Sequence, residues 1–442
     1  MSLRLLDHLG TTDALAEAFS DASLLASMLQ FEVALARVEA DAGIIPEPVA
    51  AAISRCCVPD VFDSSALARA ARTSGTVAIP FVEAIRTRVA EVDPAAATFV
   101  HWGATSQDLM DTGLVLCLVR AARILAADHE RLLAALRRTA EEHASTVMLA
   151  RTLLQPAPPT TFGLKAAGWF GAVSRSGARL FSAFEEACLL QFGGASGTLA
   201  ALGSDGVAVA DALARELGLA AADAPWHAHR DRLAALATAC GIYTGALGKI
   251  ARDISLLMQD EVAEAAEPGG TSSTMPHKRN PAGCAIALAA ATRVPGLVAA
   301  FLAGMPQEHE RGLGGWHAEA GSLSALVQSA GSALAAVSDV VEALYVSPQR
   351  MQRNIDATGA VIFAERAMML LARSLGRERA KHLVSRALEA HRAGRNFADA
   401  LAADPEAAPA LIREDLASLK APESYLGSAE RFRRRLLKIE PE

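Results

Sequence analysis

One short stretch of the chain concentrates residues that can move protons and bind anions. Residues 269–281 read Gly-Gly-Thr-Ser-Ser-Thr-Met-Pro-His-Lys-Arg-Asn-Pro. Four consecutive hydroxyl side chains precede Lys278 and Arg279, and the two glycines give the backbone freedom to hinge. Asn280 is a good helix N-cap, and Pro281 suits the first helical position. The pattern predicts a mobile, cationic loop feeding the N-terminus of a helix, which is a natural place to hold an anion.

Two other interpretations of this loop are weaker. A Gly/Ser/Thr stretch is usually a solvated linker, but here cations and a capped helix follow at once. A phosphate-binding P-loop needs a glycine directly before its Lys-Ser/Thr pair. Lys278 stands between His277 and Arg279, so the P-loop interpretation is rejected.

Three stretches together resemble the conserved regions of the fumarase/aspartase superfamily. The signature loop of that superfamily reads Gly-Ser-Ser-x-Met-Pro-x-Lys-x-Asn, and this chain departs from it at Thr271, where glycine is usual. Residues 101–108 are similar to the first conserved region, and residues 151–155 with 159–163 are similar to the second. The three occur in the family order, and the resemblance extends over nearly the whole chain.

Within the superfamily the closer resemblance is to the bacterial carboxymuconate cycloisomerases. It rests on residues 190–195, 225–227, 229–232 and 306–319. The last stretch is the most distinctive, because amine-releasing relatives usually differ after the shared Glu-Arg pair. The resemblance implies a cofactor-free intramolecular lyase that converts 3-carboxy-cis,cis-muconate to 4-carboxymuconolactone in aromatic degradation through protocatechuate and β-ketoadipate.

The resemblance also implies catalytic roles. These enzymes add or remove a proton beside a carboxylate, so a transient dianion must meet fixed donors and cations. The first serine of the loop pair carries the proton, which makes Ser272 the candidate and Ser273 its competitor. Lys278 and Asn280 would stabilise the developing charge. A serine works in this way only where its oxyanion is stabilised, and a serine in such a loop otherwise makes a turn hydrogen bond.

The expected substrate carries three carboxylates, which arginine can grip with paired hydrogen bonds. The predicted substrate-binding residues lie in or beside the matched regions and are His101, Thr105, Ser106, Arg151, Gln155, Asn280, Arg311 and His317. Surface pairing with a carboxylate is the alternative for each cation. For Arg230, which stands beside Asp231, the two interpretations have equal weight.

Leu153 marks a departure from part of the superfamily. Lyases that release an amine or a nucleotide usually have a histidine here as general acid, and leucine cannot donate a proton. When the muconate reaction runs in reverse, the leaving group is a carboxylate, which departs without protonation. The hypothesis is therefore that one acid/base suffices in this chain.

Histidine spacing does not predict a metal site. His227 and His229 lead into a helical pattern, in which residues two apart do not share a face. His309 and His317 have no nearby carboxylate spacing that completes a ligand set. The sequence predicts neither a metal nor a cofactor.

Composition excludes several classes of partner. The net charge of −7 argues against a nucleic-acid surface, which needs a basic face. The six cysteines form no Cys-x-x-Cys pair, and the N-terminus shows no secretory signal. The apolar stretch 282–305 is interrupted by Arg293 and Pro295, which favours a buried, kinked core helix over a membrane span. We expect a cytoplasmic protein with no membrane partner.

The elements that must position these residues are helical nearly throughout. No stretch alternates apolar and polar residues long enough to demand a sheet. Shorter helices are predicted near 22–43 and 78–92, with breaks at 60–65 and 73–76. Long helices are predicted near 112–145, 162–191, 229–266, 281–304 and 319–344. The third of these would span roughly 55 Å. Helices of this length with apolar faces favour a bundle, since a two-stranded coiled coil needs a sustained heptad that is missing here.

The expected fold is all-α, with an N-terminal helical domain over 1–108, a central long-helix bundle over 109–345 and a C-terminal helical domain over 346–442. By the family resemblance, the bundle assembles into a homotetramer whose active sites are shared between subunits.

Alternative functions remain open from the sequence. An adenylosuccinate or argininosuccinate type of lyase is the nearest rival, and Leu153 together with residues 314–317 speaks against it. A sulfomuconate cycloisomerase is harder to exclude, because sulfonate and carboxylate are both anionic. A non-catalytic structural or storage protein is disfavoured by the intact Ser272, Lys278 and Asn280 set.

Overall fold

The chain divides into two compact units. The computed structural model describes residues 7–271, 274–275 and 277–439. Unit 1 comprises Met1–Glu130, Arg175–Gly248 and Ile286–Ala336, and unit 2 comprises Arg131–Ser174, Lys249–Ala285 and Val337–Glu442. The three-domain boundaries at 108 and 345 stay predictions.

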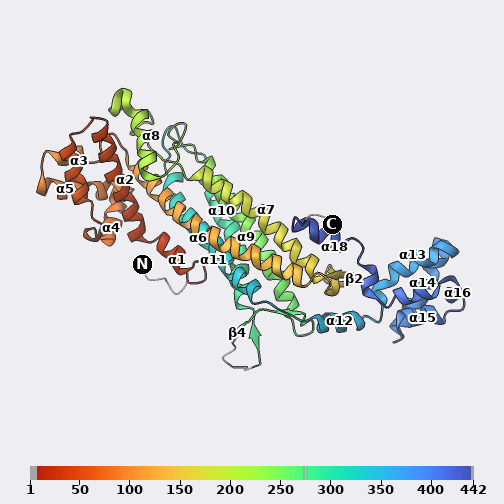
Figure 1. Cartoon of the computed structure of the whole chain (residues 1–442). Helices are drawn as coiled ribbons and strands as arrows, with labels where there is room; N and C mark the ends of the chain where they lie inside the picture. The colour runs from red at the N-terminus through yellow and green to blue at the C-terminus, as the bar shows by residue number, and fades with distance from the viewer. Residues whose placement is uncertain (1–6, 272–273, 276, 440–442) are drawn as a thin grey trace. The chain divides into compact units, whose positions relative to one another are not determined.

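Unit 1 contains short helices, most of which surround a common apolar core (Figure 1). They are α1 (Asp13–Ala18), α2 (Asp21–Asp41), α3 (Glu47–Cys56), η1 (Pro59–Val61), α4 (Ser64–Ser74), α5 (Ala78–Val92), η2 (Ala96–Phe99), η3 (Ala200–Asp205) and α8 (Gly206–Leu217). Asp63 caps the start of α4, and Gly75 ends it with φ +75°. These two residues explain the predicted breaks, because aspartate favours an N-cap and glycine accepts the left-handed conformation.

The long helices contribute residues to both units. They are α6 (Ser106–Glu142), α7 (Phe162–Ala187), α9 (Asp231–Leu257), α10 (Ala282–Gly304) and α11 (Gly315–Glu342). The all-α prediction is confirmed, but the helix predicted over 229–266 is shorter, at 27 residues or about 40 Å. The chain turns after Leu257, where Ala263 takes a φ of +49° and the Glu264 N–H bonds to the Leu257 carbonyl.

Small residues let the long helices of unit 1 approach one another. A side chain at Gly177 of α7 would meet the His129 ring of α6 at 2.2 Å. That ring also shares a 2.8 Å hydrogen bond with the Tyr243 hydroxyl of α9. Gly331 of α11 gives the same close approach to Leu15 and Leu125. A Cβ at either glycine would require the facing side chain to move, so glycine lets these side chains pack close to the helix.

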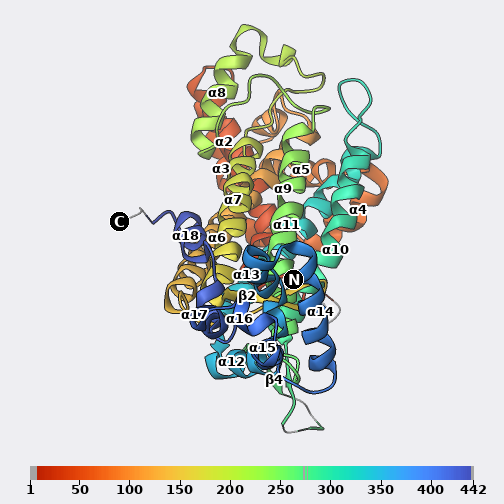
Figure 2. The same cartoon turned by 90° about the vertical axis from the view of Figure 1, so that its right-hand side faces the viewer.

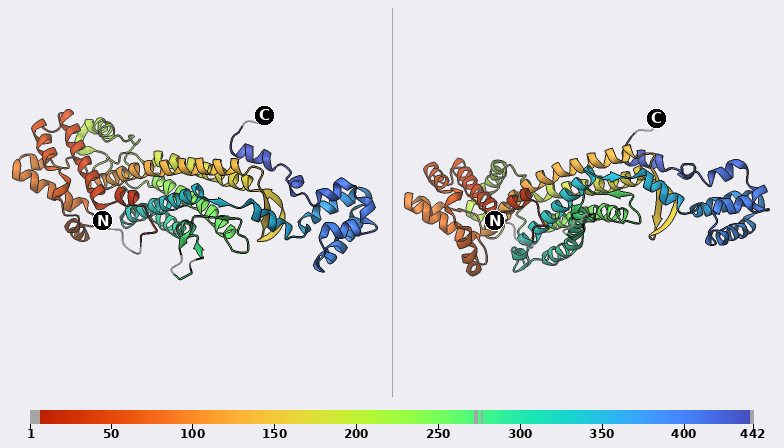
Figure 3. Two further views of the ribbon diagram at one scale, coloured as in Figure 1. Left: turned by 60° about the horizontal axis from the view of Figure 1, so that its bottom comes forward. Right: turned by 90° about the horizontal axis from the view of Figure 1, so that it is seen from below.

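Unit 2 contains a β-hairpin, although the sequence pattern predicted no sheet. Strands β1 (Val147–Thr152) and β2 (Gln155–Thr161) pair antiparallel from Val147↔Thr161 to Thr152↔Gln155 (Figure 3). Prolines in β2 hid it from the sequence, because proline is expected only at the edge of a sheet. A two-stranded ribbon has nothing but edges, so it tolerates them.

The rest of unit 2 combines short strand pairs with a C-terminal helix cluster (Figure 2). The strands are β3 (Ala265–Ala266) with β6 (Tyr345–Val346), and β4 (Gly270–Thr271) with β5 (Arg279–Asn280). The helices are α12 (Pro348–Asp356), η4 (Val361–Phe363), α13 (Ala364–Leu375), α14 (Arg377–Arg392), α15 (Phe397–Ala403), α16 (Ala407–Ala410), α17 (Arg413–Ser418), η5 (Pro422–Tyr425) and α18 (Ala429–Leu436).

Helix α10 buries only a narrow stripe within this chain. Its buried apolar residues are Cys284, Ala287, Ala290, Val294 and Phe301. By length and composition α9, α10 and α11 could each cross a membrane, and the most apolar window of α10 is only 22% buried. The expectation that this segment is a buried core helix is therefore not met by the chain's own contacts.

Candidate active site

The first conserved region forms a polar cluster around Arg311. The guanidinium donates to the Thr105 hydroxyl at 2.7 Å, to the Ser106 hydroxyl at 3.2 Å and to Gln107 Oε1 at 3.4 Å. All three acceptors are neutral, and within the described residues no carboxylate pairs with Arg311. A half-buried cation with only neutral partners attracts an anion strongly. Three predicted binding residues are thus brought together in unit 1.

Asp108 fixes the backbone of this cluster. Its carboxylate is fully buried and accepts hydrogen bonds from the backbone N–H groups of Thr105, Gly193 and Gly194, at 2.9–3.0 Å. The His227 Nε2 atom donates a fourth at 2.7 Å. A Cβ at Gly194 would lie 2.7 Å from the Gly103 carbonyl, so only glycine allows this approach. Residues 101–108, 190–195 and 225–227, matched separately in the sequence, therefore build one structure.

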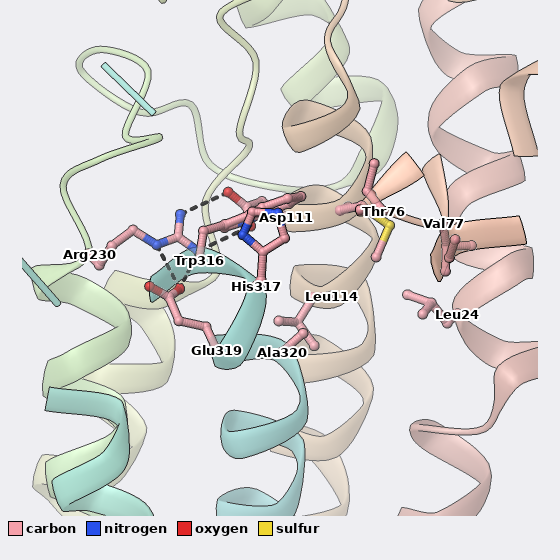
Figure 4. Close-up of a pocket in the computed structure, with 13 residues that line it drawn as sticks. Leu24, Thr76, Val77, Asp111, Leu114, Arg230, Trp316, His317, Glu319 and Ala320 are labelled. Atoms are coloured by element: carbon pink, nitrogen blue, oxygen red, sulfur yellow. Dashed lines mark hydrogen bonds and ion pairs between the residues drawn. The ribbon is translucent and has the colours of Figure 1, made fainter. Parts of the chain in front are cut away.

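Arg230, directly before α9, lies in a second, buried network. It reaches Asp111, which stands one helical turn after Asp108 on α6. It binds Asp111 through two bonds of 2.8 and 3.1 Å, and Glu319 through one of 2.8 Å (Figure 4). Trp316 Nε1 donates to Asp111 at 3.0 Å, and the guanidinium stacks 4.8 Å from the Trp226 ring centre. Arg230 is therefore paired within the core, and its partners are not the adjacent Asp231.

Two carboxylates share the single Arg230 guanidinium, and their pKa values are shifted in opposite directions. Although burial alone would raise the pKa of Asp111, its bonds to Arg230 and to Trp316 lower it below the ordinary value. Burial raises the pKa of Glu319, and the nearby Asp111 charge adds to this, while Arg230 offsets only part. The two acids that share Arg230 therefore have pKa values shifted in opposite directions.

A cavity of about 230 Å³ opens beside this network. Its wall combines the network with His317, Thr76 and apolar side chains, as Figure 4 shows. The apolar side chains of the lining belong to Leu24, Ala71, Val77, Met110, Leu114 and Ala320. His317, a predicted binding residue, therefore faces a cavity. Its ring packs edge-on against Trp316, with the ring centroids 4.9 Å apart. The cavity suits a small organic group more than an isolated ion.

His101 is held by a buried acid. Its Nδ1 atom lies 2.5 Å from a Glu32 carboxylate oxygen of α2. Burial lowers the pKa of His101, but the Glu32 charge and hydrogen bond, together with the Asp108 charge, raise it above its ordinary value.

The signature loop belongs to unit 2 and has a hairpin stem. Gly270 pairs with Asn280, and Thr271 with Arg279. Lys278 is exposed, and its N–H bonds to the Met275 carbonyl at 3.0 Å. The candidates Ser272 and Ser273 lie outside the described residues, so their catalytic roles stay predictions.

The prediction that Asn280 caps α10 is wrong. Asn280 lies in strand β5, and the Glu267 carboxylate accepts from the Gly283 and Cys284 N–H groups at 2.9 and 3.0 Å. The Glu267 carboxylate therefore occupies the helix N-terminus at which the sequence pattern predicted a bound anion.

The second conserved region lies on the β1–β2 hairpin. Arg151 forms a bidentate pair of 2.8 and 2.7 Å with Glu264, which is completely buried and also accepts from Asn354 at 2.7 Å. The charge of Arg151 is thus matched inside unit 2. Gln155 is exposed and follows the two-residue turn of Leu153 and Leu154. Its predicted role and that of Arg151 stay predictions.

The sequence did not predict the acids in these networks as site residues. Glu32, Asp111, Glu264, Glu267 and Glu319 are all buried beside residues that the sequence did single out. Their only signal was the need of each buried cation or helix end for a partner. Among the described residues, no group of three His, Cys, Asp or Glu side chains could hold a metal ion.

Family models match most of the chain. A model described as "Lyase" matches residues 8–296, and one described as "Adenylosuccinate lyase C-terminus" matches residues 360–436. These matches confirm the resemblance predicted from the three conserved regions.

Full-length relatives agree with the family match. A Pseudomonas aeruginosa protein named 3-carboxy-cis,cis-muconate cycloisomerase is 47% identical over 427 residues, covering 95% of this chain and 92% of its own length. A Bradyrhizobium diazoefficiens protein of the same name is 46% identical over 429 residues, covering 96% and 95%. The crystal structure of the 3-carboxy-cis,cis-muconate lactonizing enzyme from Pseudomonas putida matches with a TM-score of 0.93 and 45% identity over 99% of each chain.

Proposed function

The chain belongs to the lyase family of the fumarase/aspartase superfamily, and on that premise we propose that it converts 3-carboxy-cis,cis-muconate to 4-carboxymuconolactone. This reaction is an intramolecular addition, the reverse of the elimination that a lyase catalyses. One substrate carboxylate attacks the alkene to close the lactone, and a proton adds at the neighbouring carbon. Relatives and solved structures at 45–47% identity over nearly the full length support this substrate.

The observation that carries the proposal is the unmatched charge of Arg311. A tricarboxylate needs fixed cations, and Arg311 with Thr105 and Ser106 offers one carboxylate a guanidinium and two hydroxyls in a single cluster. Bidentate binding there would orient the substrate as well as hold it. The partly apolar cavity beside Asp111 and His317 is linked to this cluster through Gln107, which donates to Asp111 at 3.2 Å.

The proton chemistry is assigned to the signature loop. Ser272, or its competitor Ser273, delivers the proton to carbon, and Lys278 with Asn280 stabilises the developing dianion. The occupied N-terminus of α10 changes one part of this assignment. Because Glu267 already accepts two of its N–H groups, Lys278 and Asn280 must supply the stabilisation without them.

Leu153 fits a reaction that needs one acid/base. The attacking group is a substrate carboxylate, which is already ionised and requires no base. The same group leaves in the reverse direction without protonation. A leucine in place of the usual histidine therefore costs this reaction nothing. Leu153→His is expected to give no large gain in lactonisation.

Two exposed apolar features support a homo-oligomer, and we propose a homotetramer in the cytoplasm with sites shared between subunits. Leu153 and Leu154 form the hairpin turn with φ of +51° and +65°, and they are 96% and 74% exposed. Paired positive φ values suit Asn-Gly rather than leucines. Helix α10 likewise leaves most of its apolar surface uncovered. Packing against other copies would bury both.

Ultraviolet absorbance provides the direct test. The conjugated diene of 3-carboxy-cis,cis-muconate absorbs, and its signal should disappear on adding enzyme with a chelator present. Ser272→Ala should abolish turnover, while Ser385→Ala, at an exposed serine of α14, should not. Parallel assays use sulfomuconate and adenylosuccinate. No change with carboxymuconate but release of fumarate from adenylosuccinate would overturn the proposal.

A further inference from the structure

Glu267 is a buried acid whose described partners include no cation. It is 3% exposed, and its two carboxylate oxygens accept from the backbone N–H groups of Gly283 and Cys284. Burying a carboxylate is costly unless hydrogen bonds and positive potential replace water. Here the first turn of the 23-residue helix α10 supplies both, through its free N–H groups and its dipole.

The chain around Glu267 is tied at several points. Just before it, β3 pairs with β6 through Ala265↔Val346 and Ala266↔Tyr345. Just after it, Gly269 takes a φ of +74°, which turns the chain into β4. The carboxylate therefore spans from the start of the hairpin stem to the start of α10, and it closes the base of the signature loop.

This closure acts on residues with predicted roles in the reaction. Asn280 stands three residues before Gly283, and its strand pairs with Gly270, three residues after Glu267. Lys278 is two residues further toward the tip. Without the carboxylate, the stem of two residue pairs would be the remaining cross-link between the two sides of the loop at this end.

We propose that Glu267 is a positioning residue for Lys278 and Asn280. Its carboxylate fixes the stem of the signature loop on the N-terminus of α10, so that these two side chains are presented in one geometry. The proposal rests on the proposed function for the roles of Lys278 and Asn280. The helix N-terminus thereby orders the loop and is not a subsite for the substrate.

The test compares two variants with a matched control. Glu267→Ala removes the carboxylate, and Glu267→Gln keeps its shape without its charge. Asn396→Ala removes a comparable cap, because Asn396 accepts from the Ala398 and Asp399 N–H groups at the start of α15. We expect kcat of Glu267→Ala to fall on the order of 100-fold with KM nearly unchanged, since small misplacements of reacting groups have such effects. Glu267→Gln should be intermediate, and Asn396→Ala should keep the wild-type kcat.

Added formate distinguishes positioning from loss of fold. Formate can refill the space left in Glu267→Ala and should restore part of its kcat. It should not help Glu267→Gln, and in the wild type it should act only as a competitor of the substrate. A wild-type kcat in Glu267→Gln, or an equal loss in Asn396→Ala, overturns the proposal. So does a folded Glu267→Ala enzyme that formate cannot rescue.

Hydrogen exchange makes the result independent of the substrate. If the wild type leaves carboxymuconate unchanged, the proposed function fails but Glu267 can still be tested. The peptide covering residues 277–285 should exchange faster in Glu267→Ala than in the wild type, and formate should restore its protection. Equal exchange in both proteins refutes the positioning role.

Discussion

The two acids that share Arg230 should respond very differently to neutral isosteric replacement. Asp111 accepts bonds from Arg230 Nη1 and Nη2, Gln107, Gln191 and Trp316. An asparagine amide would face several of these donors with its own N–H groups. Removing one partner of a buried ion pair costs about 3–5 kcal/mol, and we expect Asp111→Asn to lose free energy of unfolding in this range.

Glu319→Gln should cost less. Because the pKa of Glu319 is raised, the fold stabilises its charge less than that of Asp111, and Asp111 continues to balance Arg230. One glutamine oxygen can accept from Arg230. The Gln307 oxygen, which has no described partner, can then accept from the new amide after a flip of the Gln307 side chain. We therefore expect Glu319→Gln to lose less free energy of unfolding than Asp111→Asn, since its side-chain hydrogen bonds are exchanged and not lost.

Urea unfolding followed by tryptophan fluorescence measures both variants. Trp226 and Trp316 contact this network directly, so their emission reports on it. The pH dependence adds a second criterion. Because the pKa of Glu319 is higher in the folded than in the unfolded chain, its contribution is complete below the ordinary carboxyl pKa and is lost as pH rises through the raised value. Glu319→Gln should therefore gain stability relative to wild type as pH rises. Equal destabilisation by the two variants would contradict the opposite pKa shifts of the two acids.

Three further outcomes follow from individual contacts. Arg311→Ala should raise KM for carboxymuconate by about 10- to 150-fold, the equivalent of a charged hydrogen bond of about 1.5–3 kcal/mol; an unchanged KM would remove Arg311 from the binding site. Glu39 is buried, its two oxygens have no hydrogen-bond partner among the described residues, and burial and the Glu32 charge raise its pKa to about 9. The Glu39 contribution to wild-type stability should therefore decline as pH rises from about 4.5 to about 9 and level off above that, while Glu39→Gln should not show this decline in urea unfolding. Leu153→Glu should weaken the oligomer in sedimentation experiments, and an unchanged sedimentation coefficient would exclude the hairpin turn from the interface.

The helices could be predicted from the sequence because their signals are local. Helix α5 begins and ends where the apolar pattern predicted, and Asp63 and Gly75 mark the limits of α4. The β1–β2 hairpin could not, because its pairing brings together residues whose prolines argue against a strand. The end of α9 was overestimated for a related reason. Residues that favour a helix, mainly Met, Gln, Glu and Ala, continue past Leu257, but the chain turns at Ala263 and β3 then pairs with β6.

The sequence predicted which types of residue form the candidate site, but not which of its arginines lack a carboxylate partner and could bind a substrate. Sequence motifs identified Arg151, Arg230 and Arg311 without showing which of them could meet a substrate. That depends on buried acids far away in the chain: Glu264 lies 113 positions from Arg151, and Asp111 lies 119 from Arg230. Helical periodicity carries no signal for such pairs, since each acid could equally face water.

Charge matching inside the fold therefore ranks the three arginines for function. Arg151 and Arg230 already have carboxylate partners, and a substrate carboxylate would have to displace a buried acid to reach them. That exchange would leave the acid buried and unpaired, at a cost of about 3–5 kcal/mol. Arg311 holds only neutral oxygens, which a substrate carboxylate can join or replace at no such cost. Loss of Arg311 should thus weaken substrate binding directly, whereas loss of Arg151 or Arg230 should first appear as lost stability.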